Sequence, residues 1–334
     1  MQVLGMHLES TYKTMQAGPD SIFRWRLLYY LISVSERACS IHRTLPVTLD
    51  HSIVFPLMDN SDPEQRGFVI LSDLFTPFDR VFSTYRDSGF LPFADPDAYV
   101  LNLHRLVTQA CPDYTYFIDF PGPKPFPKAI IADLLVNKQW LLIKIYHLAI
   151  SQSLLTYLPP EADLGLLYPI KVARELLDII ELLGGDSFEI HGGSMLEKFY
   201  DIASMLADLV QIVPIPPNSP GAEMAQPLAT PGLGGASRQE SLGDRGQTSV
   251  TSQPRTAQGF GPNDLLSALV KLVSQLRKEH NPYLPMLMAK VHQCLQVGAT
   301  KPEQVHRQPL YEAIGFEFDD LFLRFNSGDN TDAL

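Results

Sequence analysis

The sequence predicts an all-α fold, a layered helical domain with a long disordered internal linker. Apolar residues recur at intervals of three and four along several stretches, which is the spacing of one face of a helix. Two such stretches, 21–43 and 172–213, are expected to lie at the centre of the helical layers. Between 214 and 262 this spacing is absent, and Pro, Gly, Ser, Thr and Gln predominate, a composition typical of disorder.

Composition limits the classes of function. The chain has 334 residues, 45% of them hydrophobic and 19% charged, so one large domain or two modest ones with a sizeable core are expected. Its formal net charge is −11 and no block of Lys and Arg occurs. Direct DNA binding is therefore doubtful, because phosphate neutralisation dominates that affinity. No signal peptide and no apolar run near the ~20 residues of a membrane span is evident, so we expect a soluble intracellular protein.

The three cysteines do not form a recognisable site. Cys39, Cys111 and Cys294 are far apart, and none has a Cys-x-x-Cys partner. A zinc site with ordinary ligand spacing cannot be built from them. Buried or idle thiols in a reducing compartment are expected, with Cys39 on an apolar helix face.

The first helix is expected from 21 to 43. On a helical wheel its polar residues gather on one side, together with two tyrosines: Arg26, Tyr29, Tyr30, Ser33, Glu36, Arg37, Ser40 and Arg43. The rest is mostly apolar: Leu27, Leu28, Leu31, Ile32, Val34, Ala38, Cys39 and Ile41. This pattern predicts a helix that buries a wide apolar face and keeps a narrow cationic stripe at the surface. Asp20 or Ser21 is expected to cap its start, and Pro46 requires it to end before Leu45.

The stripe contains a candidate regulatory or partner face, formed by Arg26, Tyr30, Glu36, Arg37 and Arg43. Two interpretations remain open. A charged stripe is commonly no more than the solvated side of a helix. Alternatively, it is a contact face for a ligand or for a segment of a partner protein.

Further helices are expected at 68–85, 99–109, 129–158, 172–183 and 194–213, and another from 263 onwards. Pro77 is expected to break the first of these. Ser194 and Glu197 have the spacing of a capping box, in which each side chain bonds a backbone N–H of the other residue. Asn263 is expected to cap the helix that follows the linker.

The chain is thereby divided into three parts. Residues 1–213 and 263–310 are expected to form one helical domain, 214–262 the disordered linker, and 311–334 a tail that mixes acidic and aromatic residues. Such a tail is a candidate for activation or for binding a coactivator. The alternative is a frayed end that packs a few phenylalanines on the core.

No catalytic constellation is evident. Gly192-Gly193-Ser194 begins like a nucleophile elbow, but Leu196 stands where the second glycine is required. No Gly-rich loop with Lys is present to bind phosphate, and none of the nine histidines is spaced as a metal-binding pair. His147, on an apolar helix, is expected to lie in the core. We predict a protein that is not an enzyme and holds no cofactor or metal; the alternative is an all-α enzyme or small-molecule binding protein without a local signature.

Several segments resemble a known family. They are Arg26-Leu27-Leu28-Tyr29, Glu36-Arg37, Arg43-x-x-Pro46-x-Thr48-Leu49, Leu74-Phe75-x-Pro77-Phe78-Asp79, Gln139-Trp140-Leu141, Glu197-Lys198-Phe199-x-Asp201-Ile202-Ala203 and Tyr283-Leu284-Pro285. Together they resemble the regulatory domain, or middle homology domain, of fungal binuclear-zinc-cluster transcription factors, in particular the regulators of starch and maltose utilisation.

The resemblance implies a nuclear regulator, shuttling with the cytoplasm, of carbohydrate-utilisation or secondary-metabolite genes. It also implies a protein partner, either a DNA-binding paralogue or a coactivator, and a small-molecule effector. The family's six-cysteine zinc cluster has no counterpart here, so neither zinc nor direct DNA contacts are expected. We interpret the chain as a truncated relative, a split gene or a regulator that acts through a partner. Segment 214–262 exceeds the family's connection and is either a genuine loop or a retained intron.

Overall fold

The computed structural model describes residues 5–49, 53–91, 95–155, 164–212, 261–276 and 281–299. Within these ranges the regular elements are α-helices and no β-strand occurs, which confirms the all-α prediction. The helices are α1 (Glu9–Thr14), α2 (Pro19–Arg43), α3 (Pro63–Phe75), α4 (Arg80–Ser88), α5 (Pro96–Ala110), α6 (Tyr114–Ile118), α7 (Lys128–Ser151), α8 (Tyr168–Leu183), α9 (Asp186–Glu189), α10 (Gly193–Ile212), α11 (Pro262–Gln275) and α12 (Tyr283–Ala299). The predicted linker, 214–262, lies almost wholly outside these ranges, and the tail, 311–334, lies wholly outside them.

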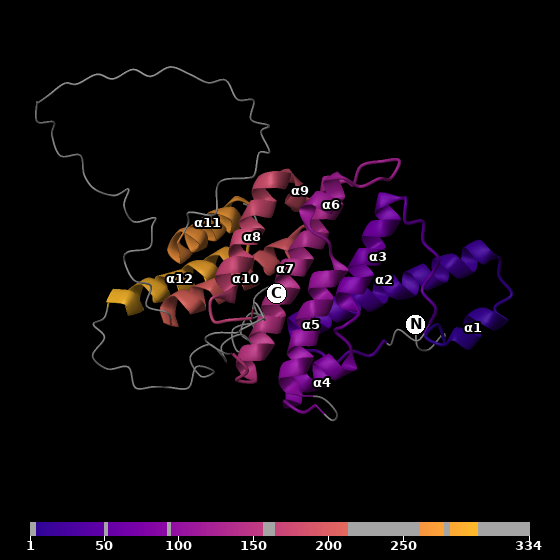
Figure 1. Ribbon diagram of the computed structural model, residues 1–334, viewed down its shortest axis with the longest axis horizontal. Coiled ribbons are helices and arrows are strands. Elements are labelled where there is room, and N and C mark those ends of the chain that lie inside the picture. The colour runs from indigo at the N-terminus through magenta and orange to yellow at the C-terminus, as the bar shows by residue number, and fades with distance from the viewer. Residues whose placement is uncertain are drawn as a thin grey trace, which may run out of the picture.

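Helix α7 forms the centre of the molecule (Figure 1). Most of its residues from Ile131 to Ile150 are buried, because it packs against α3 and α5 on one side and against α8 and α10 on the other. Helix α10 in turn packs against α11 and α12. Four helices thus cover most of the apolar stretch of α7. Helix α7 takes the central place that was expected for 21–43, whereas α10 lies within 172–213, the other stretch that was expected at the centre.

Several predicted boundaries are confirmed and others are wrong. The break near Pro77 is present, since α3 ends at Phe75 and α4 is capped by Asp79, whose carboxylate accepts from the N–H groups of Val81 and Phe82. Helix α2 does not use a cap at Asp20 or Ser21: it begins at Pro19, whose fixed φ suits a first helical position. Helix α7 ends at Ser151 rather than at residue 158.

The two later caps are also wrong. Ser194 lies inside the first turn of α10 and donates to the carbonyl of His191, while Glu197 contacts other helices instead of reaching back. Asn263 lies inside α11, which begins one residue earlier, and the Asp264 carboxylate accepts from the N–H of Gly261 at 3.0 Å. At α11 the neighbouring Asp264 therefore takes the capping role that was expected of Asn263.

Two separate clusters of buried residues are present. The main core is built around α7 and α10 and includes buried residues of every helix from α2 to α12. The smaller N-terminal core is formed by Met6, Tyr12, Tyr29, Tyr30, Leu49 and Ile53. Helix α2 connects them, since its first half lies in the N-terminal core and Val34 and Ile41 lie in the main core.

The predicted orientation of α2 is wrong. Its polar side is the buried one: Tyr29, Tyr30, Ser33, Arg37 and Ser40 are at most 5% exposed. Its apolar side faces outward: Trp25, Leu28, Leu31 and Ile32 are 37 to 44% exposed, and Cys39 is exposed too. The reversal has a physical cause, because segments 5–15, 44–49 and 53–55 pack on the polar side and bond several of its side chains. His147 of α7 is likewise exposed rather than part of the core.

Candidate regulatory site on helix α2

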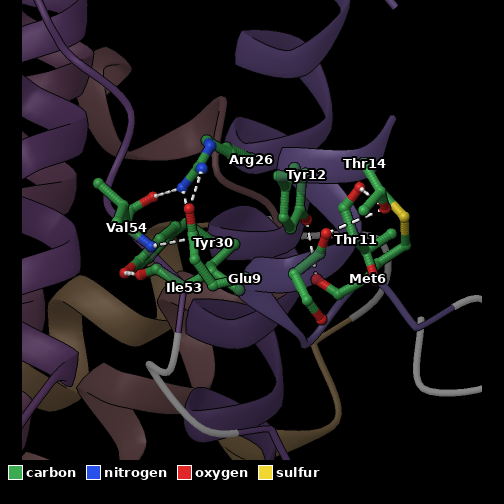
Figure 2. A network of polar contacts seen from close by, with 10 residues as sticks. Met6, Glu9, Thr11, Tyr12, Thr14, Arg26, Tyr30, Ile53 and Val54 are labelled. Atoms are coloured by element: carbon green, nitrogen blue, oxygen red, sulfur yellow. Dashed lines mark hydrogen bonds and ion pairs between the residues drawn. The ribbon is translucent and has the colours of Figure 1, made fainter. Parts of the chain in front are cut away.

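Arg26 is the centre of a clamp that holds three segments together (Figure 2). Its guanidinium donates to both oxygens of Glu9 in α1, at 2.9 and 2.5 Å, and to the backbone carbonyl of Val54 at 2.6 Å. The Val54 N–H donates to Glu9 at 3.0 Å, which closes a ring of three partners. The guanidinium also lies 4.6 Å from the ring centroid of Tyr12. The hydrogen bonds from Arg26, and then that from Val54, hold the pKa of Glu9 below its usual value.

Tyr30 and Glu36 fasten the segment that follows α2. The hydroxyl of buried Tyr30 donates to the carbonyl of Ile53 at 2.7 Å. The Glu36 carboxylate accepts from the N–H groups of Thr48 and Leu49, both at 2.9 Å, and from the Thr48 hydroxyl. A chain reversal after Thr44, which has a left-handed φ of 53°, makes these contacts geometrically feasible. The polar stripe therefore holds 44–49 and 53–55 against α2.

The remaining two residues of the predicted face differ from each other. Arg37 is only 2% exposed and donates to the hydroxyl and carbonyl oxygens of Ser33, one turn earlier in the helix. Arg43 is exposed at the last turn of α2. Of the five predicted residues, Arg43 is the one whose side chain is exposed; the other four are buried or half-buried and bond other groups of the chain. Whether this face binds a partner stays a prediction.

A second polar cluster joins the C-terminal end of α2 to the main core. His42 contacts Glu197 of α10 through Nε2, and its Nδ1 lies 3.9 Å from Oδ2 of Asp201. The same Asp201 oxygen accepts from Trp140 Nε1 at 2.7 Å and lies 2.8 Å from Nζ of Lys144. We call these residues the His42 cluster.

The His42 cluster extends to α12. The Tyr283 hydroxyl donates to Glu197 Oε1 at 2.8 Å. Burial, followed by this hydrogen bond, raises the pKa of the Tyr283 phenol, so the hydroxyl keeps its proton and remains a donor. The Asp201 side chain is 3% exposed and its charge is balanced by Lys144. The cluster thereby links α2, α7, α10 and α12 through charge-assisted contacts.

The partners in these clusters could not be found from local sequence patterns. Glu9 lies in 1–19, where the apolar periodicity is too weak to mark a contact with another helix. His42, Asp201 and Glu197 were not grouped because the contacts span more than 150 residues and no local spacing marks them. The described residues contain no group of three or more His, Cys, Asp and Glu that could hold a metal ion. No helix in the described ranges is long and apolar enough to cross a membrane.

Comparison with known proteins identifies relatives. The chain is 26% identical to the probable sucrose utilization protein of Candida albicans, over 63% of this chain and 40% of the relative. It is 25% identical to a maltose fermentation regulatory protein of Saccharomyces cerevisiae, over 62% of this chain and 42% of the relative. It is 23% identical to a respiratory transcription factor of the same yeast, over 63% of this chain and 43% of the relative.

The chain is similar to fungal zinc-cluster regulators. This finding confirms the resemblance that the sequence segments indicated. The chain spans less than half the length of the curated relatives it matches. No family model matches it, and no solved structure matches it. The relatives are transcription regulators rather than enzymes, which favours a role in transcription regulation.

Proposed function

We propose that the chain is the regulatory domain of a fungal transcription regulator that controls genes of carbohydrate utilisation or secondary metabolism. The observation that carries the proposal is the similarity to regulators named for sucrose and maltose use, which extends over nearly two thirds of the chain. The all-helical structure is compatible with it. The domain acts in the nucleus, together with a protein partner, and senses a small-molecule effector.

The proposal assigns DNA reading to another module. The 334 residues carry a net charge of −11, and Arg26 and Arg37 are engaged inside the molecule. Phosphate contacts supply most of the affinity of a DNA-binding protein, and an acidic chain has few free cationic groups to make them. We therefore expect the affinity of the chain for DNA to be low. The partner that supplies the DNA-reading module is a paralogue with its own zinc cluster, and a coactivator is the other class of partner.

A reporter assay tests regulation directly. The full chain is fused to an unrelated DNA-binding module, and reporter transcripts are measured in fungal cells grown on glucose and on maltose or sucrose. We expect the transcript level to depend on the fused chain and on the sugar. Equal transcripts with and without the chain, on every sugar, would contradict the proposal.

A matched pair of variants tests the α2 face within the same assay. Arg43→Glu reverses an exposed charge of the predicted face, whereas Lys13→Glu reverses an exposed charge at the end of α1. We expect Arg43→Glu to reduce the reporter response and Lys13→Glu to leave it unchanged. Equal responses for the two variants would remove the α2 face from the proposal.

A gel-shift titration of the purified chain tests whether DNA binding belongs to a partner rather than to this chain. At about 0.15 M salt, with and without added zinc, we expect weak or no binding to duplex DNA. Tight binding that falls steeply with salt concentration would show a basic surface on the chain itself, and the partner would then not be needed for DNA reading.

A further inference from the structure

The outward side of α2 is an apolar strip with a cation at each end. Trp25, Leu28, Leu31 and Ile32 are between 37 and 44% exposed on a helix of 25 residues. Arg24 and Arg43 are exposed at its two ends, roughly 28 Å apart along the axis at 1.5 Å per residue. In Figure 1 the first half of α2 extends beyond the layers of α7, α8 and α10. Exposed apolar patches of this kind mark interaction sites.

The strip has the spacing of a helix-pairing seam. Exposed residues follow one another at alternating intervals of three and four: Trp25, Leu28, Ile32, Ser35 and Cys39. This alternation is the pattern that places side chains of one helix between those of a second helix. The opposite side of α2 is already used by the N-terminal core, so the seam is not the side that stabilises the fold.

Charge decides between the occupants of the seam. A second copy of the chain would bring another net charge of −11 and the same two arginines. An acidic amphipathic segment would instead place carboxylates near Arg24 and Arg43 and apolar side chains on Leu28 and Ile32. The strip therefore favours an acidic partner segment over self-association.

The chain itself contains a segment of this chemistry. Residues 311–334 include six acidic residues and one arginine, and their apolar residues Ile314, Phe318, Leu321 and Phe325 follow one another at intervals of four, three and four. Residues 300–310 connect it to α12 and span up to roughly 36 Å when extended. The segment has the same seam spacing as α2 and the opposite charge.

We propose that the exposed side of α2 is a docking surface for the acidic segment 311–334 of this chain. The seam residues Phe318, Leu321 and Phe325 pack on Leu28 and Ile32. A segment that is docked in this way is withheld from a coactivator, and a competing partner for either surface releases it. The inference goes beyond the proposed function and does not depend on which genes are regulated.

Trp25 gives a direct readout of docking. The chain has two tryptophans, and Trp140 is only 2% exposed, so quenching by acrylamide reports mainly on Trp25. A Trp25→Phe variant supplies the blank for Trp140. Native full-length chain is compared with the seam variant Phe318→Ser, Leu321→Ser and Phe325→Ser. The control is Phe316→Ser, which changes an aromatic residue off the seam.

We expect the seam variant to raise the acrylamide quenching of Trp25 roughly two-fold, since docking covers most of its 40% exposure. Phe316→Ser should behave like the native chain. Adding a synthetic peptide of residues 311–334 to the seam variant should restore the low quenching, and 0.5 M or more salt should weaken that effect. Equal quenching in native chain, seam variant and control, with no response to the peptide, would overturn the proposal.

A change on the α2 side provides the reciprocal test. Ile32→Glu alters an exposed residue and should leave folding intact, which circular dichroism verifies. Made in the seam variant, this change should weaken binding of the labelled peptide at least ten-fold, whereas Leu101→Glu in the same background, an exposed position on α5, should leave the binding unchanged. Peptide binding that is unaffected by Ile32→Glu would place the segment elsewhere and refute the proposal.

Discussion

The main core and the N-terminal core are held together by different chemistry. The main core buries aliphatic and aromatic side chains of α7, α8 and α10 against one another, and its stability comes from apolar area removed from water. The N-terminal core contains three tyrosines among its six buried residues, and Arg26 and Tyr30 bond backbone carbonyl groups at its edge. Hydrophobic spacing alone reveals the first kind of core but not the second.

The largest expected effect belongs to the main core. Leu206 of α10 is fully buried, and Leu206→Ala should lower the free energy of unfolding by about 2–5 kcal/mol through lost contacts and a cavity. Leu31→Ala, on the exposed side of α2, is the control and should change it by less than ~0.5 kcal/mol. Urea denaturation followed by circular dichroism measures both. Similar losses for the two variants would mean that the outward side of α2 is part of a core.

A smaller loss is expected when a hydrogen bond of the N-terminal core is removed. Tyr30→Phe deletes the hydroxyl that donates to Ile53 and leaves a buried carbonyl without that donor. The expected loss in the free energy of unfolding is about 1–2 kcal/mol. Hydrogen exchange should show the opening confined to 5–55. An unchanged free energy of unfolding would mean that this core is held by apolar contacts alone.

The fold was largely predictable from the sequence because its longest apolar stretches are locally periodic. The spacing of apolar residues predicts α5, α8 and α10, and the geometry of proline predicts the break at Pro77. The predictions at Ser194 and Asn263 failed because α10 and α11 begin one residue earlier than expected, at Gly193 and Pro262, which places both residues inside the first turn. The continuous apolar run of α7 has no preferred side, and its central position becomes clear only when its neighbours are known.

The candidate site was predictable only in part. The sequence predicts that Arg26, Tyr30, Glu36, Arg37 and Arg43 form a regulatory or partner face on α2, and the binding role of this face stays a prediction. The sequence could not show that this side is buried, since the partners Glu9, Val54 and Ile53 come from segments without periodicity. A polar stripe looks solvated when the backbone groups that satisfy it are unknown.

The Glu9–Arg26 pair tests how far charge contributes to the N-terminal core. A double-mutant cycle with Glu9→Gln and Arg26→Met should give a coupling of about 1 kcal/mol, because the pair is bidentate and partly shielded from solvent. A coupling near zero would mean that the bonds of Arg26 and Glu9 to the Val54 backbone, rather than the ion pair, hold the three segments together.

The same pair predicts a pH dependence. The folded-state pKa of Glu9 lies below its usual value of 4.5. Stability from this group is therefore fully present above about pH 4.5 and is lost as the pH falls through the folded-state pKa. The protection factors of the α1 amides, which correct for the intrinsic pH dependence of exchange, should fall below pH 4.5 in the native chain and not in Glu9→Gln. An equal fall in both would attribute the change to other carboxyl groups.

The smallest expected effect concerns the reactivity of cysteine thiols rather than stability. It contrasts the outward side of α2 with the main core. Cys39 is exposed on the outward side of α2, whereas Cys111 is fully buried and burial raises the pKa of its thiol to about 12. Burial also raises the pKa of Cys294. Because the thiolate is the reactive form, a thiol reagent at about pH 8 should modify Cys39 first and the other two only on unfolding. Cys39→Ser should abolish the fast phase and leave the unfolding-dependent phase intact. A fast phase that persists in Cys39→Ser would show that the main core opens readily, and the contrast between its closed packing and the exposed side of α2 would then be lost.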